Sequence, residues 1–232
     1  MPEERRHDSL NTHARVGGAL YILVVVIYGA GAYLLQDLGA RIQNGNLSDQ
    51  LIIDDNVFHS GVVLQLAAAW LTLMLAYTLY VVLGPVGRSL ALFALVFRAI
   101  EAALFGVSAT AGIVALDFLR EPHLVAVIAP NQAVEFAGLL LRLHGISEFT
   151  AITFYAFGSA AFFWLFFRGG CIPRMLSFAG IIGTVLLFVW SLAGIILPSG
   201  AEWPGIYFWL PISLAEIAVG VWLLARGVAI SR

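Results

Sequence analysis

Three ionisable residues lie inside long apolar stretches of the sequence, where charge is costly. Arg98 and Glu101 occur in FRAIEAALFG, and Glu216 occurs in SLAEIAVGVW. A charged side chain at the centre of a membrane helix costs about 2.5–3.5 kcal/mol to insert, so such residues are functional candidates by default. Arg98 and Glu216 each lie ten residues from the arginine that ends their stretch. Both are therefore expected at a depth of roughly 15 Å and can meet at one level.

Two carboxylates that share one guanidinium can perform acid–base chemistry. Glu101 follows Arg98 by three residues and so shares its helix face. Arg98 is expected to hold one carboxylate ionised, while the apolar surroundings keep the other protonated. We therefore predict that Glu101 is a proton donor assisted by Arg98 and Glu216. The alternative is that the three charges only pair with one another and lock two helices together.

Two further pairs lie near the expected outer ends of helices. Asp55 and His59 open the second apolar stretch, and His144 and Glu148 open the fourth. Each pair has the i, i+4 spacing that shares one helix face. Such a set is compatible with zinc, but HExxH and similar signatures are missing, so we predict no metal and no cofactor. We predict catalytic roles for His144 and Glu148 at a cavity mouth, with His59 binding substrate.

Aromatic residues are expected around the acid, because an aromatic face stabilises a developing cation. Counting along the stretches places four of them within about a turn of the depth of Glu101. We predict that these four bind substrate, with ordinary core packing as the alternative: Tyr28, Trp70, Tyr155 and Trp190. Three aromatics near the start of the last stretch are instead expected to anchor it at the membrane interface: Trp203, Tyr207 and Trp209.

Six apolar stretches carry these residues, and each is long enough to cross a bilayer. About 20 helical residues span a hydrocarbon core of about 30 Å. The predicted spans are Val16–Leu35, Val57–Leu83, Ser89–Leu116, Ile146–Phe167, Met175–Leu197 and Gly205–Ala225. We therefore predict an all-α polytopic membrane helical bundle with one transmembrane domain. We expect three parts along the chain: a cytoplasmic N-terminal segment over 1–15, the six-helix transmembrane domain over 16–226 and a cytoplasmic tail over 227–232.

The arginines indicate the orientation of these spans, because short cytoplasmic segments carry an excess of Lys and Arg. Only Arg41 and Arg120 lie clearly in the loops opposite the termini. The arginines on the side of the termini are Arg5, Arg6, Arg15, Arg88, Arg168, Arg174, Arg226 and Arg232. We therefore expect both termini in the cytoplasm and a multi-pass protein in the inner (plasma) membrane.

A helical stretch, AVEFAGLLLRLH, directly precedes the fourth span. A helix running unbroken through both would be roughly 54 Å long and would overshoot the bilayer. We therefore expect a bend near Gly145 or Ser147, with the outer piece lying on the membrane as a lid. A single long, tilted helix is the alternative.

The composition excludes several classes of protein. Hydrophobic residues make up 61% and charged residues 11% of the 232, and the mean hydropathy is +0.93. Soluble domains have about 45–50% apolar and about 25% charged residues. A net charge of −2 without a dense basic cluster argues against a nucleic-acid partner, and the single cysteine, Cys171, excludes an internal disulfide. The expected partners are the lipid bilayer and a lipophilic small molecule.

Four motifs are spread along the chain: F-R-x-x-E-A, H-x-x-x-E, I-P-R-x-L and a Glu six residues before W-L-L. They lie at Arg98 and Glu101, His144 and Glu148, Pro173 and Arg174, and Glu216 and Trp222. Together they resemble a widespread bacterial family of membrane proteins with about six spans, classed as a domain of unknown function. The resemblance covers nearly the whole chain and implies a fold but no activity.

A looser similarity, in size and in acids at mid-membrane depth, is to the small integral-membrane terpene cyclases, which usually have nearer seven spans. In those enzymes a membrane-embedded acid protonates an epoxide or alkene, and ring closure follows. The leading hypothesis is therefore an integral membrane enzyme that starts cyclisation or isomerisation of a lipophilic isoprenoid-type substrate by protonating it. The alternatives are a proton-coupled small-solute transporter, with Glu101 and Glu216 binding the proton or cation, and a structural membrane subunit.

Overall fold

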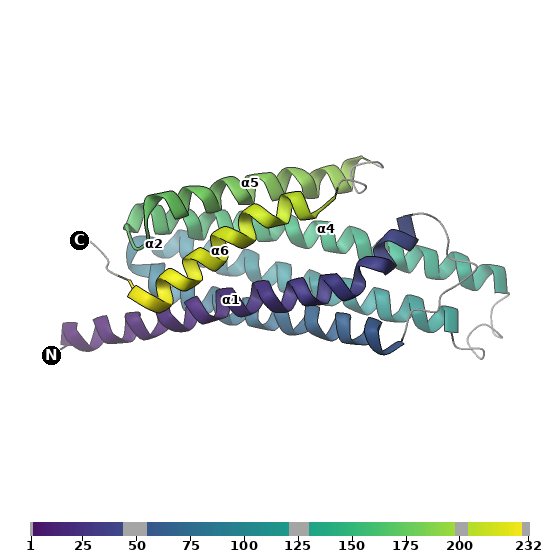
Figure 1. Cartoon of the computed structure of the whole chain (residues 1–232), viewed down its shortest axis with the longest axis horizontal. Coiled ribbons are helices and arrows are strands. Elements are labelled where there is room, and N and C mark those ends of the chain that lie inside the picture. Colours follow the sequence, from purple (N-terminus) through teal and green to yellow (C-terminus); the bar gives the residue numbers. More distant parts are fainter. Residues whose placement is uncertain (1, 44–54, 121–129, 198–203, 229–232) are drawn as a thin grey trace.

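The protein is a bundle of long α-helices that lie side by side along one axis (Figure 1). The computed structural model describes residues 2–43, 55–120, 130–197 and 204–228. Its helices are α1 (Pro2–Gln43), α2 (Asp55–Arg120), α4 (Pro130–Gly169), α5 (Arg174–Ile196) and α6 (Ile206–Arg226). All five of these helices are long and apolar enough to cross a membrane. The predicted all-α fold is confirmed, and the helices indicate a multi-pass membrane protein.

α2 contains two of the predicted spans, separated by a break in the helix. Gly87 has φ −173° and ψ 87°, outside the helical region, and Pro85 lies two residues before it. Glycine is a poor helix former because its backbone is unrestricted, and Pro85 removes one helical hydrogen bond just before it, so both residues weaken the helix at this point. Phe58, near the start of α2, packs in one core cluster with Leu116, near its end. The segments 55–86 and 88–120 therefore fold back on each other.

α4 is one helix of 40 residues, which corresponds to roughly 60 Å at the α-helical rise. It passes through Gly145 and Ser147 as uninterrupted helix, so the expected bend into a separate outer piece is wrong. The outer part of α4 does not lie apart as a lid, because it packs against the second segment of α2. The rings of Phe118 and Phe136 are 4.8 Å apart, and Ser108 of α2 contacts His144 of α4. These contacts hold α4 along the bundle.

α1 and α6 cross at a contact between two glycines, Gly18 and Gly220. A Cβ atom on Gly18 would lie 2.6 Å from the carbonyl oxygen of Gly220, and a Cβ on Gly220 would lie 2.8 Å from that of Gly18. Small residues at helix crossings in membranes let two backbones approach this closely. Beyond the crossing, α6 runs towards α5 and away from α1 (Figure 1). The two helices therefore diverge along the bundle.

The start of α1 and the end of α6 are tied together at one end of the bundle. Gly227, which ends α6, has φ 63°, a left-handed conformation that glycine adopts without strain. The next amide, on Val228, donates a hydrogen bond to Oδ1 of Asn11 in α1, at 3.1 Å. This bond connects residues 217 positions apart and holds the first part of α1 beside the end of α6.

We predict that Gly18→Ala lowers the free energy of unfolding by about 1–3 kcal/mol, because the new methyl group would collide with the backbone of α6. The measurement is unfolding by SDS titration in mixed micelles, followed by circular dichroism. Gly29→Ala on the same helix is the matched control, since a Cβ there meets no atom within 4 Å. The control should unfold no more easily than the wild type. Equal destabilisation by both variants would contradict the crossing as described.

Candidate functional site

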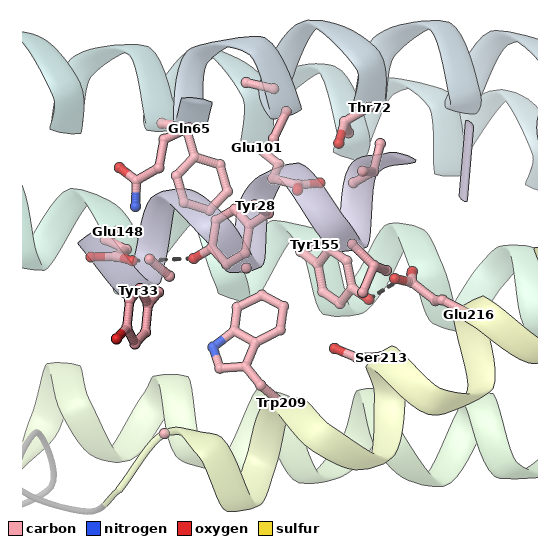
Figure 2. A pocket seen from close by; sticks show the side chains of 18 of the residues that line it. Tyr28, Tyr33, Gln65, Thr72, Glu101, Glu148, Tyr155, Trp209, Ser213 and Glu216 are labelled. Atoms are coloured by element: carbon pink, nitrogen blue, oxygen red, sulfur yellow. Dashed lines mark hydrogen bonds between the residues drawn. The ribbon is translucent and has the colours of Figure 1, made fainter. Parts of the chain in front are cut away.

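A cavity of about 550 Å³ lies between α1, α2, α4 and α6, where α1 and α6 have diverged (Figure 2). Its volume is within the range of about 300–1,000 Å³ typical of small-molecule sites. Most of the wall is apolar, with polar or aromatic groups contributed by all four helices. These are Tyr28, Tyr33, Gln65, Thr72, Arg98, Glu101, Phe105, Glu148, Tyr155, Trp209, Ser213 and Glu216.

Arg98 and Glu101 form a buried ion pair in the wall of this cavity. Nη1 of Arg98 lies 3.1 Å from Oε2 of Glu101, as expected for residues three apart on one helix. Nη1 also donates a hydrogen bond to Oγ of Ser159, at 3.2 Å. No N–H group is directed at Oε2 of Glu101, which accepts no hydrogen bond among the residues that the structure describes. The carboxyl group therefore has a neighbouring charge but an unused acceptor.

A glycine of α4 makes room for the arginine. A Cβ on Gly158 would lie 3.0 Å from both Cγ and Cδ of Arg98, so the aliphatic part of the side chain lies directly on the backbone of α4. The next residue, Ser159, supplies the hydroxyl that binds the guanidinium. The pair Gly158–Ser159 thus positions the cation, and sequence reasoning did not single it out.

Tyr155 connects the arginine to the third charged residue. The guanidinium carbon of Arg98 lies 4.4 Å from the centre of the Tyr155 ring, a cation–π contact. The hydroxyl of Tyr155 donates a hydrogen bond to Oε1 of Glu216, at 2.8 Å (Figure 2). The structure therefore brings Arg98, Glu101 and Glu216 together, as the sequence predicted, with Tyr155 between the arginine and Glu216.

Tyr28, Trp209 and Tyr155 form an aromatic wall of the cavity (Figure 2). The Trp209 ring is 5.1 Å from that of Tyr28 and 5.6 Å from that of Tyr155, measured between ring centres. The hydroxyl of Tyr28 donates to Oε1 of Glu148, at 3.2 Å. Trp209 was expected to be an interfacial anchor, but it points inward because it lies seven residues, or two helical turns, before Glu216 on the same face of α6. Trp203 is outside the described residues.

The cavity is not lined by four other predicted site residues: His59, Trp70, His144 and Trp190. Trp70 is 64% exposed on α2, and His59 is also exposed. Trp190 packs on Phe149, with ring centres 5.0 Å apart. Counting residues from the ends of the predicted spans gave the position of these side chains along the helix axis. It did not specify which side of the helix they occupy. Ala68, Ala69 and Thr72 line the cavity, which leaves Trp70 facing away from it.

His144 is held between α2 and α4 rather than at the cavity. Its Nδ1 lies 2.8 Å from the hydroxyl oxygen of Ser108 and 2.9 Å from the carbonyl oxygen of the same residue. Glu148, one turn further along α4, does line the cavity. The described residues contain no group of His, Cys, Asp and Glu that could hold a metal ion, and the side chain of Asp55 lies outside the described set.

Gln65, Thr72, Ser213 and Trp209 line the cavity although sequence reasoning did not assign them to the site. Gln65 lies in the apolar stretch VVLQLAAAW, and a polar residue in such a stretch is a signal that the sequence already offers. Thr72 and Ser213 give no such signal, because their hydroxyls can bond to a carbonyl of their own helix.

Residues 16–227 match the family DUF4386, described as a domain of unknown function. The chain belongs to this family. No curated protein and no solved structure matches the chain. The resemblance inferred from the motifs is therefore confirmed for the family, while the similarity to terpene cyclases has no support from these comparisons. Function has to be argued from the cavity itself.

We predict that Arg98→Leu lowers the free energy of unfolding by about 3–5 kcal/mol, because it leaves the two buried carboxyl groups of Glu101 and Glu216 without a cation. The double variant Arg98→Leu/Glu101→Leu should be more stable than Arg98→Leu alone, since it removes both members of the pair. SDS unfolding of the wild type, both single variants and the double variant completes the cycle. Simple additivity of the two single effects would show that the residues are not coupled.

Proposed function

We propose that this protein is a multi-pass membrane enzyme that protonates a lipophilic, isoprenoid-type substrate in the cavity and thereby starts its isomerisation or cyclisation. The observation that carries this proposal is the carboxyl group of Glu101. It is 4% exposed and lines the cavity, and its Oε2 accepts no hydrogen bond among the described residues. The side chain of Glu101 therefore borders the space that a bound molecule would occupy.

The balance of charge supports the presence of a proton at this site. Two carboxyl groups, Glu101 and Glu216, share one guanidinium, that of Arg98, in the apolar interior of the bundle. With all three ionised, the cluster would carry a buried net negative charge, which is costly in a low-dielectric medium. One proton on the pair of carboxyl groups removes that charge. Since Glu216 already accepts a hydrogen bond from Tyr155, we assign the donated proton to Glu101.

The aromatic wall supports the second step of the reaction. Protonation of an alkene or epoxide forms a new C–H or O–H bond and leaves a carbocation on the substrate. The faces of Tyr28, Trp209 and Tyr155 can stabilise that cation. Loss of a proton from a neighbouring carbon to the Glu101 carboxylate restores the acid. The product is then an isomer of the same mass, with or without a new ring.

We predict that Glu101→Gln lowers turnover by about 10²–10⁴-fold with little change in unfolding, because glutamine keeps the shape of the side chain but has no acidic proton. The assay uses purified protein in detergent with an epoxidised or unsaturated prenyl lipid, and detects the isomeric product by gas chromatography and mass spectrometry. Glu135→Gln, an exposed acid on α4 that does not line the cavity, is the matched control.

Two results would contradict the proposal. Full activity of folded Glu101→Gln would show that another residue donates the proton, with Glu216 the next candidate. Absence of any conversion, combined with Glu101-dependent proton or solute flux into reconstituted vesicles, would favour the proton-coupled transporter. A carrier needs a polar path through the membrane, whereas an enzyme for a lipophilic substrate needs only a pocket around one acid.

We further propose six membrane crossings, with both termini in the cytoplasm and the protein in the inner membrane. The break at Gly87 and the contact of Phe58 with the far end of α2 support two crossings within α2. The arrangement of arginines supports the orientation. α1 begins and α6 ends at the same end of the bundle, as an even number of crossings requires (Figure 1).

Introduced cysteines test this topology. Cys171 itself is a poor probe, because it is 4% exposed and burial raises its thiol pKa to about 11. In a Cys171→Ser background, Ser9→Cys and Gln132→Cys occupy exposed positions on α1 and α4. We expect an impermeant maleimide to label Gln132→Cys in intact cells, and Ser9→Cys only after permeabilisation. Labelling of both from the same side would mean that α2 crosses only once.

A further inference from the structure

The cavity opens sideways between α1 and α6. Four of its lining residues are also exposed on the outer surface of the bundle, two on each helix: Gly29, Tyr33, Ile206 and Leu210. A Cβ added to Gly29 would meet no atom within 4 Å, so the backbone of α1 borders open space at this point. All four residues lie within the apolar candidate spans of α1 and α6. The opening therefore faces lipid when the protein is in a membrane.

The two ends of the cavity differ in chemistry. Glu216, four residues before the Gly18–Gly220 crossing on α6, marks one end, together with Arg98 and Tyr155. Gln65 and Glu148 lie at the other end, with Tyr33 (Figure 2). An apolar and aromatic section separates the two ends.

Gln65 has hydrogen-bonding capacity that the protein does not use. Its side chain is 7% exposed and lines the cavity, yet its amide makes no hydrogen bond with another described residue. The amide borders the cavity, so a ligand there can supply the hydrogen-bond partners that the described residues do not. Nearby, Glu148 uses Oε1 to accept from Tyr28. One amide and one carboxylate together can bind a hydroxyl group, which donates one hydrogen bond and accepts another.

We propose that the opening between α1 and α6 is a lateral portal through which an uncharged lipid alcohol enters from the bilayer. Its hydroxyl is bound by Gln65 and Glu148, and its hydrocarbon chain lies along Trp209 opposite Glu101. This proposal names the substrate class for the proposed enzyme and rests on that function only for what happens after binding. A phosphorylated lipid does not fit, because Arg98, the only basic residue that lines the cavity among those the structure describes, is at the opposite end and already paired.

Photocrosslinking tests the proposal without requiring turnover. The full-length protein in lipid nanodiscs is exposed to a farnesol that carries a diazirine in its chain, and mass spectrometry locates the label. We expect label on cavity-lining residues of α1 and α6. Unlabelled farnesol should compete about tenfold better than farnesyl phosphate or the hydrocarbon farnesane, since only the alcohol satisfies Gln65 and Glu148 without burying a second anion. Equal competition by farnesane or by farnesyl phosphate would overturn the assigned class.

Variants test the portal separately from the polar end of the cavity, by which we mean the end that holds Gln65 and Glu148. Gly29→Phe should reduce labelling about tenfold by filling the opening, and Leu210→Trp should do so from the side of α6. Gly138→Phe is the matched control, because a Cβ there also meets nothing within 4 Å and the residue does not line the cavity. Gln65→Leu should abolish the preference for alcohol over hydrocarbon. Unchanged labelling in folded Gly29→Phe and Leu210→Trp would exclude this portal.

The variant Glu101→Gln distinguishes an error in the proposed binding site from an error in the proposed enzymatic function. Glu101→Gln should bind the probe as well as the wild type does, because it changes neither the opening nor the polar end. Binding of farnesol by both proteins with no conversion of any prenyl substrate would leave the binding site established and the enzyme proposal wrong. Loss of binding in Glu101→Gln would instead contradict the assigned position of the hydroxyl.

Discussion

The buried guanidinium of Arg98 is the interaction on which the candidate site depends. A cation in an apolar interior must be surrounded by partners, and here they come from two helices: Glu101 on α2, with Ser159 and the Tyr155 ring on α4. Tyr155 extends the same network to Glu216 on α6. The requirement that one cation be satisfied therefore also determines how three helices lie around the cavity.

The space for a ligand follows from how the remaining helix, α1, packs. Gly18 and Gly220 allow α1 and α6 to touch at one end, and the helices separate beyond that point. Gly29 of α1 borders the space between the two helices and has no side chain to fill it. The rings of Tyr28, Tyr33 and Trp209 line this space without closing it. A tight crossing at one end and a separation beyond it, on the same pair of helices, thus leave a cavity that opens on the side of the bundle between α1 and α6.

Much of the fold could be predicted from hydropathy, because the requirement to span the bilayer acts on local sequence. The apolar stretches became helices, and the break between the second and third stretches lies at Gly87, beside Pro85. The prediction for α4 was wrong because helix length alone suggested a bend into a separate outer piece, while packing of that outer part on α2 supports a continuous helix. Tertiary contacts outweighed the length argument there.

The sequence alone determined that charge is placed at membrane depth, and counting from the ends of the spans brought Arg98, Glu101 and Glu216 to one level. It could not decide which aromatics face the cavity: Tyr28 and Tyr155 do, Trp70 faces outward, and Trp209 replaces Trp190. The position of a residue along a helix follows from its number in the sequence. Whether its side chain faces the cavity depends on where the neighbouring helices lie, which the sequence alone does not specify. A cavity exists where helices fail to meet, and that depends on crossings such as the one at Gly18 and Gly220, between residues about two hundred positions apart.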